Sequence, residues 1–180
     1  MTLIKSIAGF RGTIGGETGD TLNPLDIVKS VTAFAMLRRP LVGQYENKIV
    51  VGRDARISGE MVSHCVCGAL LGMGFDVVNI GLATTPTTEL AITAEHAAGG
   101  IIITASHNPR HWNALKFMDE NGEYIAPEIA HELIVLVDQT DKFVYADVDH
   151  VGHYYEKNDY NQYHIDLIKR LKLVDVDAIR

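Results

Sequence analysis

The sequence predicts an α/β fold of three layers, with helices on both faces of a mixed, mainly parallel sheet. Short apolar runs rich in β-branched residues alternate with amphipathic segments, which is typical of βαβ units. The runs at 48–52 and 75–81 flank an amphipathic segment at 59–73, and this spacing indicates a right-handed crossover between parallel strands. Asn121-Gly122 lies between two short extended runs and predicts a hairpin. We therefore expect an antiparallel edge on a parallel sheet.

Composition and charge support one packed core and exclude several kinds of partner. The chain has 180 residues, of which 47% are hydrophobic and 22% charged, and its net charge is −7. An acidic balance argues against nucleic acid as a partner. No apolar run approaches the roughly 18 to 20 residues that span a bilayer, and the N-terminus has no signal-peptide core. We expect a cytoplasmic protein that binds neither nucleic acid nor membrane.

The first third of the chain predicts a strand, a glycine loop and a helix. A short strand is expected at 4–7, and four glycines within 9–16 predict a loop whose backbone can approach a ligand closely. Asn23-Pro24 opens a helix, because Asn caps free amides and Pro is tolerated in the first turn. The helix ends near Arg38 and Arg39, whose side chains are expected to be solvated or to favour the carboxyl end of the helix dipole.

The middle of the chain predicts two further helices between buried strands. Ser58 is expected to cap the helix that Gly74 ends. Thr85 is expected to cap the next helix, which runs to about Glu95 and leads into the central strand.

Cys65 and Cys67 stand beside His64, which raises the alternative of a metal site. Positions two apart on a helix point about 200° apart around its axis, so the thiols would not converge on one ion. We expect both to be reduced thiols that pack in the core.

In the last third of the chain the alternation of buried strands and helices gives way to another pattern. Extended runs at 115–118 and 123–125 form the expected hairpin, and Pro127 begins a helix. The stretch 140–153 is polar and aperiodic, which indicates a connection. A last amphipathic helix is expected at 160–171.

The stretch from Gly99 to Lys116 carries the chemistry. Three consecutive isoleucines predict a buried strand, which the polar run from Ser106 to Pro109 stops. Ser106 should therefore lie on a stiff exposed loop at a strand end, where open α/β sheets bind ligands. From the residues alone Ser106 could be a hydrolytic nucleophile, a loop serine without a chemical role or a phosphate carrier. The first is disfavoured, because adjacent side chains such as His107 tend to point apart and no Gly-x-Ser-x-Gly elbow is present.

This stretch resembles the phosphoserine loop of the α-D-phosphohexomutases, the family of phosphoglucomutase, phosphomannomutase and phosphoglucosamine mutase. The resemblance rests on Thr104-Ala105-Ser106-His107-Asn108-Pro109 and on Asn113-Ala114-Leu115-Lys116. Two more motifs are similar to the family's, Phe10-Arg11-Gly12 and Gly52-Arg53-Asp54-Ala55-Arg56. Phosphohexomutases have four domains. The resemblance implies that 1–145 is the first domain and that 146–180 is a connecting helix and the start of the second.

The resemblance implies a reaction and its cofactors. Ser106 would be phosphorylated and would move a phosphoryl group between positions 1 and 6 of a hexose phosphate through a bisphosphate, and hexose 1,6-bisphosphate would act as activator. Mg²⁺ would bind an oxygen on Ser106 and an Asp-rich loop of the second domain. Two Asp-x-Asp runs, 147–149 and 175–177, lack the rest of that loop's pattern and are expected to be solvated acids. The remaining domains of the enzyme would be partners, so the chain alone should have little or no mutase activity.

The resemblance also implies roles for single residues. Lys116 would transfer a proton to or from the sugar hydroxyl, whereas without the motif it would be an ordinary surface lysine at a strand end. Catalytic roles are expected for Ser106, Lys116, Arg11 and His107, and substrate or phosphate binding for Arg11, Arg53, Asn108 and Lys116.

Arg53 and Arg56 would brace the serine loop or help hold its charge. Without the resemblance, Arg53-Asp54 indicates a structural salt bridge. The alternative function is a non-catalytic module that binds sugar phosphates or regulates their use. Discrimination between glucose, mannose and glucosamine phosphates is expected to lie in other domains.

Overall fold

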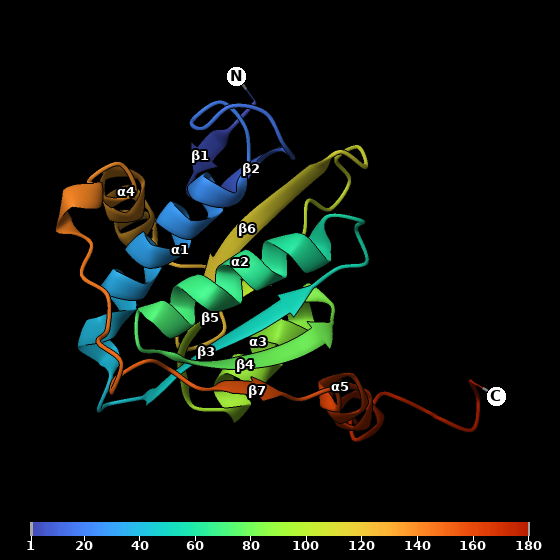
Figure 1. Ribbon diagram of the computed structural model, residues 1–180. Helices are drawn as coiled ribbons and strands as arrows, with labels where there is room; N and C mark the ends of the chain where they lie inside the picture. Colours follow the sequence, from blue (N-terminus) through green and yellow to red (C-terminus); the bar gives the residue numbers. More distant parts are fainter. Residues whose placement is uncertain (1, 180) are drawn as a thin grey trace.

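The computed structural model describes residues 2–179 and contains one seven-stranded sheet with helices on both faces (Figure 1). The predicted three-layer α/β fold with a mixed sheet is confirmed. The strand order is β1-β2-β6-β5-β3-β4-β7. The strands are β1 (Ile4–Ser6), β2 (Gly9–Thr13), β3 (Glu46–Arg53), β4 (Asp76–Leu82), β5 (Ala97–Ile103), β6 (Trp112–Met118) and β7 (Tyr154–Glu156).

Two groups of helices cover the two faces of the sheet. On one face α1 packs against α2 and α4, and α2 contacts β3 and β4 (Figure 1). On the other face α3 packs on β5 and β3, and α5 contacts α3. The helices are α1 (Pro24–Arg38), α2 (Gly59–Gly72), α3 (Thr85–Ala94), α4 (Pro127–Leu136) and α5 (Tyr160–Lys169).

The predicted βαβ unit is present, and it sets the direction of the sheet. β3, α2 and β4 form it, and β5 adds to the other side of β3 in the same direction. Of the seven strands, β1 and β6 run against the other five. The carboxyl ends of β3 and β5 therefore lie at the same edge of the sheet, and the segments that follow them are neighbours.

The expected glycine loop is wrong in its first half, because residues 9–13 form strand β2 between β1 and β6. Gly9 has φ +111, and a Cβ there would lie 2.4 Å from the carbonyl oxygen of Leu115. Gly9 therefore reflects the close approach of β2 to β6 and not a flexible loop.

Three smaller expectations were also wrong. The side chain of Ser58 makes no cap bond to α2, and the residue that caps α3 is Thr84. Residues 123–125 form no strand, and a single bridge joins Tyr124 to Met118. These errors share a cause. A helix or strand boundary that moves by one residue, or a side chain that rotates, is enough to form or remove a cap or a pair of strands.

Arg38 is buried instead of solvated. Only 5% of the residue is exposed, and its Nη1 lies 3.0 Å from an oxygen of Glu120. Burial lowers the pKa of Arg38, although the charge of Glu120 acts in the opposite direction. The end of α1 is therefore held by an ion pair between buried Arg38 and partly exposed Glu120.

Cys65 and Cys67 are free thiols, as expected. Cys67 belongs to the core between the sheet and α1, α2 and α4, and Cys65 packs against it. Burial raises the pKa of the Cys67 thiol to about 11, which keeps it protonated and unreactive.

Directly after the polar connection lies a strand that the sequence does not predict. β7 pairs in parallel with β4, and so extends the sheet beyond residue 145. The division at 145/146 remains a prediction. Within residues 2–179 we find no helix with the length and apolar character of a membrane span.

Candidate active site

Ser106 lies on an exposed loop just beyond the carboxyl end of β5. The loop leaves the strand after Ile103 and reaches β6 at Trp112. Ser106 has φ +52, a backbone conformation that residues other than glycine adopt infrequently. The structure thus agrees with the predicted placement of a hydroxyl at the rim of the sheet.

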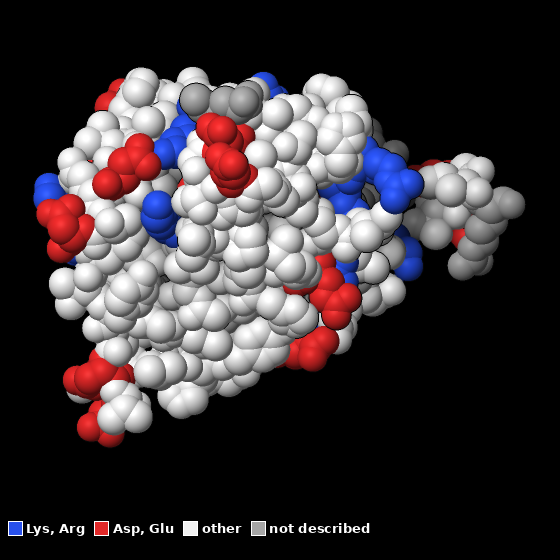
Figure 2. Space-filling view, turned by 45° about the horizontal axis from the view of Figure 1, so that its top comes forward, with Lys and Arg blue, Asp and Glu red and all other residues white. Residues whose placement is uncertain are grey.

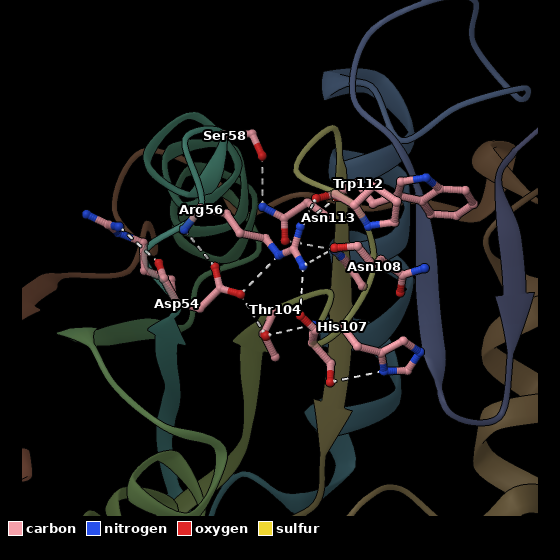
Figure 3. Close-up of polar contacts among 12 residues, drawn as sticks. Asp54, Arg56, Ser58, Thr104, His107, Asn108, Trp112 and Asn113 are labelled. Atoms are coloured by element: carbon pink, nitrogen blue, oxygen red, sulfur yellow. Dashed lines mark hydrogen bonds and ion pairs between the residues drawn. The ribbon is translucent and has the colours of Figure 1, made fainter.

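Arg56 lies across this loop and holds its backbone (Figure 3). Its Nη2 donates to the carbonyl oxygens of Ser106 and Asn108 at 2.8 and 2.7 Å. Its Nη1 donates to those of Pro109 and Trp112 at 2.9 and 3.0 Å. The bracing role expected for Arg56 therefore has a direct geometric basis.

A second contact ties the far end of the loop to the start of α2. Asn113 donates from Nδ2 to the Ser58 hydroxyl at 3.0 Å, and Asn113 is fully buried (Figure 3). Ser58 thus serves the loop and not the helix cap that the sequence suggested.

A cavity of about 620 Å³ opens beside Ser106. Arg11 pairs with Ala114 across β2 and β6, and Lys116 lies two residues further along the same face of β6. The intervening Phe10 and Leu115 point to the opposite face and are buried in the core. The cavity is lined by Ser6, Ile7, Ala8, Gly9, Arg11, Ala105, Ser106, His107, Asn108, Ala114, Lys116, Tyr124, Ile125, Ala126 and Pro127.

The lining of the cavity is cationic. It includes Arg11 and Lys116, and none of the described residues that line it is an aspartate or a glutamate. Figure 2 shows one face of the molecule, on which acidic side chains are scattered and several lysine and arginine side chains gather on the right of that view. In a chain of net charge −7, a cavity without carboxylates suits an anionic ligand such as a phosphate.

Two side chains in the cavity have defined neighbours. Lys116 donates from Nζ to the Tyr124 hydroxyl at 3.3 Å, and Nζ lies 5.6 Å from the centre of the Tyr124 ring. The Nδ1 atom of His107 lies 3.5 Å from the Ser106 hydroxyl oxygen. Tyr124 was not among the expected site residues, since its short extended run carries no signal of chemistry.

Of the expected site residues, Arg53 lies apart from the cavity. Its Nη1 donates to the carbonyl oxygen of Asp54 at 3.2 Å, and Arg53 is not among the residues that line the cavity. The structure gathers around the cavity Arg11, Ser106, His107, Asn108 and Lys116.

Mg²⁺ would find few ligands in this chain. The described residues contain no group of three His, Cys, Asp or Glu side chains that could hold a metal ion. The runs 147–149 and 175–177 have exposed aspartates, and Asp147 pairs with His150. An oxygen on Ser106 remains the expected contribution of this chain.

Fold and site together define a three-layer α/β domain that presents a serine beside a cationic cavity at the edge of its sheet. Residues 4–143 match the family model described as phosphoglucomutase/phosphomannomutase, alpha/beta/alpha domain I. The chain therefore belongs to the phosphoglucomutase/phosphomannomutase family.

Relatives and solved structures agree with this assignment. A phosphoglucomutase/phosphomannomutase of Thermococcus kodakarensis is 36% identical over 175 residues, covering 94% of this chain and 36% of the relative. A phosphoglucosamine mutase of Levilactobacillus brevis is 31% identical, and the match covers 73% of this chain and 30% of the relative. The crystal structure of a family protein from Burkholderia thailandensis aligns with a TM-score of 0.74 at 25% identity. The alignment covers 96% of this chain and 36% of that protein. The chain thus spans about a third of the length of these proteins.

Proposed function

We propose that this chain is the phosphoserine-bearing domain of a phosphohexomutase, and that Ser106 carries the phosphoryl group. The observation that supports this most directly is the braced, exposed Ser106 beside a cavity lined by Arg11 and Lys116 and free of carboxylates. A phosphoserine carries about −1.5 to −2 charges at neutral pH, so it needs cations nearby. Arg11 and Lys116 supply them.

The proposed reaction consists of two transfers in opposite directions. A hydroxyl of the bound hexose phosphate attacks the phosphorus on Ser106, and the bond from phosphorus to the serine oxygen breaks. Lys116 gives one proton of its ammonium group to the departing serine oxygen and takes the proton of the attacking hydroxyl, so it begins and ends each transfer as a cation. The hexose bisphosphate then turns around, and its other phosphate transfers to Ser106 by the same steps. The sugar leaves with its phosphate on the other position.

Other residues of the cavity would orient these groups. Arg11 offsets phosphate charge by direct hydrogen bonds. His107 and Asn108 hold the phosphorylated serine in place, and Tyr124 orients the Lys116 ammonium.

Mg²⁺ would offset the charge of the transferring phosphoryl group when bound. This chain would contribute one oxygen on phosphorylated Ser106, and other parts of the enzyme would supply the remaining ligands. Hexose 1,6-bisphosphate would act as activator, because it phosphorylates an empty Ser106.

The test is to incubate the purified chain and the full-length protein with glucose 1,6-bisphosphate and to map phosphate by intact mass and peptide analysis. We expect one phosphoryl group on Ser106 of the full-length protein and none in its Ser106→Ala variant. The chain alone should show little or no mutase turnover. A full-length protein that stays unmodified at Ser106 would contradict the proposal and favour a non-catalytic sugar-phosphate module.

A further inference from the structure

We propose that Asp54, Arg56 and Thr104 are positioning residues that hold Ser106 in its left-handed backbone conformation and keep its hydroxyl at the wall of the cavity. The role of these residues in catalysis depends on the proposed function. The contacts that hold Ser106 are present in the structure without any substrate.

The conformation of Ser106 needs support from its surroundings. A side chain at φ +52 brings Cβ close to the backbone carbonyl oxygens, which disfavours this region for residues other than glycine. Such a conformation persists at a functional site when neighbouring groups enforce it.

The loop's own backbone does not provide this support. Within the loop, the amide of Asn108 donates to Ala105 at 3.0 Å and that of Trp112 donates to Pro109 at 2.9 Å. Neither bond involves the N–H or the carbonyl of Ser106. Both of these groups are instead bound by side chains.

Thr104, Asp54 and Arg56 form a closed ring with Ser106 (Figure 3). The Ser106 amide donates to the Thr104 hydroxyl at 3.2 Å, and that hydroxyl donates to Asp54 Oδ2 at 2.7 Å. The same Asp54 oxygen lies 3.3 Å from Arg56 Nε, and Arg56 Nη2 returns to the Ser106 carbonyl. Asp54 thus orients both side chains that hold the backbone of Ser106.

Arg56 is committed to this task. Its two terminal nitrogens carry four N–H groups, and four carbonyl oxygens accept from them. The guanidinium therefore shapes the loop and has no terminal donor left for a phosphate. A lysine has three donors on one atom and cannot reproduce the planar fork.

The first test compares Thr104→Val, which removes the hydroxyl and keeps the shape, with Thr104→Ser, which keeps the hydroxyl. We expect amide exchange at Ser106, measured by NMR, to accelerate at least about tenfold in Thr104→Val. In Thr104→Ser it should stay within about twofold of the parent. Of these two Thr104 variants, the valine variant alone should move the Ser106 Cα shift away from its left-handed value.

Arg56→Lys provides a second variant on the other side of the ring, should the valine variant fold poorly. It should also shift the Ser106 Cα resonance, because one ammonium cannot bind four carbonyls. In the full-length enzyme, Thr104→Val should lower kcat at least about tenfold with KM within about twofold, and Thr104→Ser should restore kcat.

Folded Thr104→Val and Arg56→Lys variants with an unchanged Ser106 amide exchange rate and Cα shift would overturn this inference. The exchange measurement needs no phosphoryl transfer, so its failure is separate from a failure to phosphorylate Ser106. Variants that change the NMR signals of Ser106 but leave kcat unchanged would also overturn it, because the ring would then be structural only.

Discussion

Arg38 shows how one side chain at the end of a helix can be drawn into the core. Its side chain is 6% exposed and that of its partner Glu120 is 21% exposed. Burying a charge is costly unless an opposite charge compensates it. The guanidinium also lies 5.8 Å from the ring of Phe34, so its stem and its charge both have partners.

We expect Arg38→Met to lower the free energy of unfolding by about 1 to 3 kcal/mol, less than for a fully buried pair because Glu120 can regain water. Lys169→Met is the matched control, since Lys169 and Asp166 form an exposed pair at 3.9 Å. That change should stay within about 0.5 kcal/mol. Urea unfolding of both variants measures the difference, and equal effects would contradict a buried role for Arg38.

At the scale of elements, β2 decides the geometry of the cavity. It lies between β1 and β6, and its register with β6 brings Arg11 opposite Ala114. Glycine at position 9 allows this register, because a larger residue would meet the backbone of β6. The placement of Arg11 near Lys116 thus depends on a residue without a side chain.

We expect Gly9→Ala to lower the free energy of unfolding by about 3 kcal/mol or more, because its Cβ would meet the Leu115 carbonyl. Gly15→Ala is the control, since Gly15 also has positive φ, at +89, but has no atom within 4 Å of the new Cβ. Gly15→Ala should lower the free energy of unfolding by only about 1 to 2 kcal/mol, because alanine disfavours a positive φ. Urea unfolding distinguishes them, and similar losses would show that β2 can move away from β6.

At the scale of the whole molecule, Glu95 fastens the C-terminal segment to the sheet domain. Its side chain is 7% exposed, it lies 2.5 Å from Lys157 Nζ, and it accepts a hydrogen bond from the Tyr160 hydroxyl. Burial raises the pKa of Glu95, but the bonds from Lys157 and Tyr160 outweigh burial and hold the pKa below its usual value. Burial and the neighbouring Glu95 raise the pKa of Tyr160, which stays protonated as the donor.

This contact predicts a pH dependence for the attachment of β7 and α5. Because the pKa of Glu95 is lower in the folded state, its contribution is complete above the unfolded value of about 4.3. It is lost as the pH falls through the folded value. The protection of amides in β7 and α5, that is, their exchange relative to the intrinsic rate at each pH, should therefore fall below about pH 4 in the parent chain.

In Glu95→Gln this protection should already be lower at pH 6 and should change less as the pH falls. Asp166→Asn, an exposed carboxylate on α5, is the control and should behave as the parent does. Identical pH profiles for the parent and Glu95→Gln would contradict the role of Glu95.

Much of the fold and the site could be predicted from the sequence. The βαβ unit, the helix opened by Asn23 and the serine loop are local patterns, because caps, periodicity and turn residues act within a few positions. Five expected site residues line one cavity, whereas Arg53 is not among the residues that line it. Local patterns also misled: the glycines near the N-terminus fit a loop as well as a closely packed strand.

The sequence by itself determined the helices, most of the strands and where a serine would be exposed, since hydrophobic period and backbone preference are properties of short stretches. Only the tertiary structure decided which distant groups meet. Arg56 binds carbonyls 50 to 56 positions away, and β7 pairs with β4 across 77 residues. Such contacts depend on strand order and on two surfaces fitting each other. No single segment contains that information.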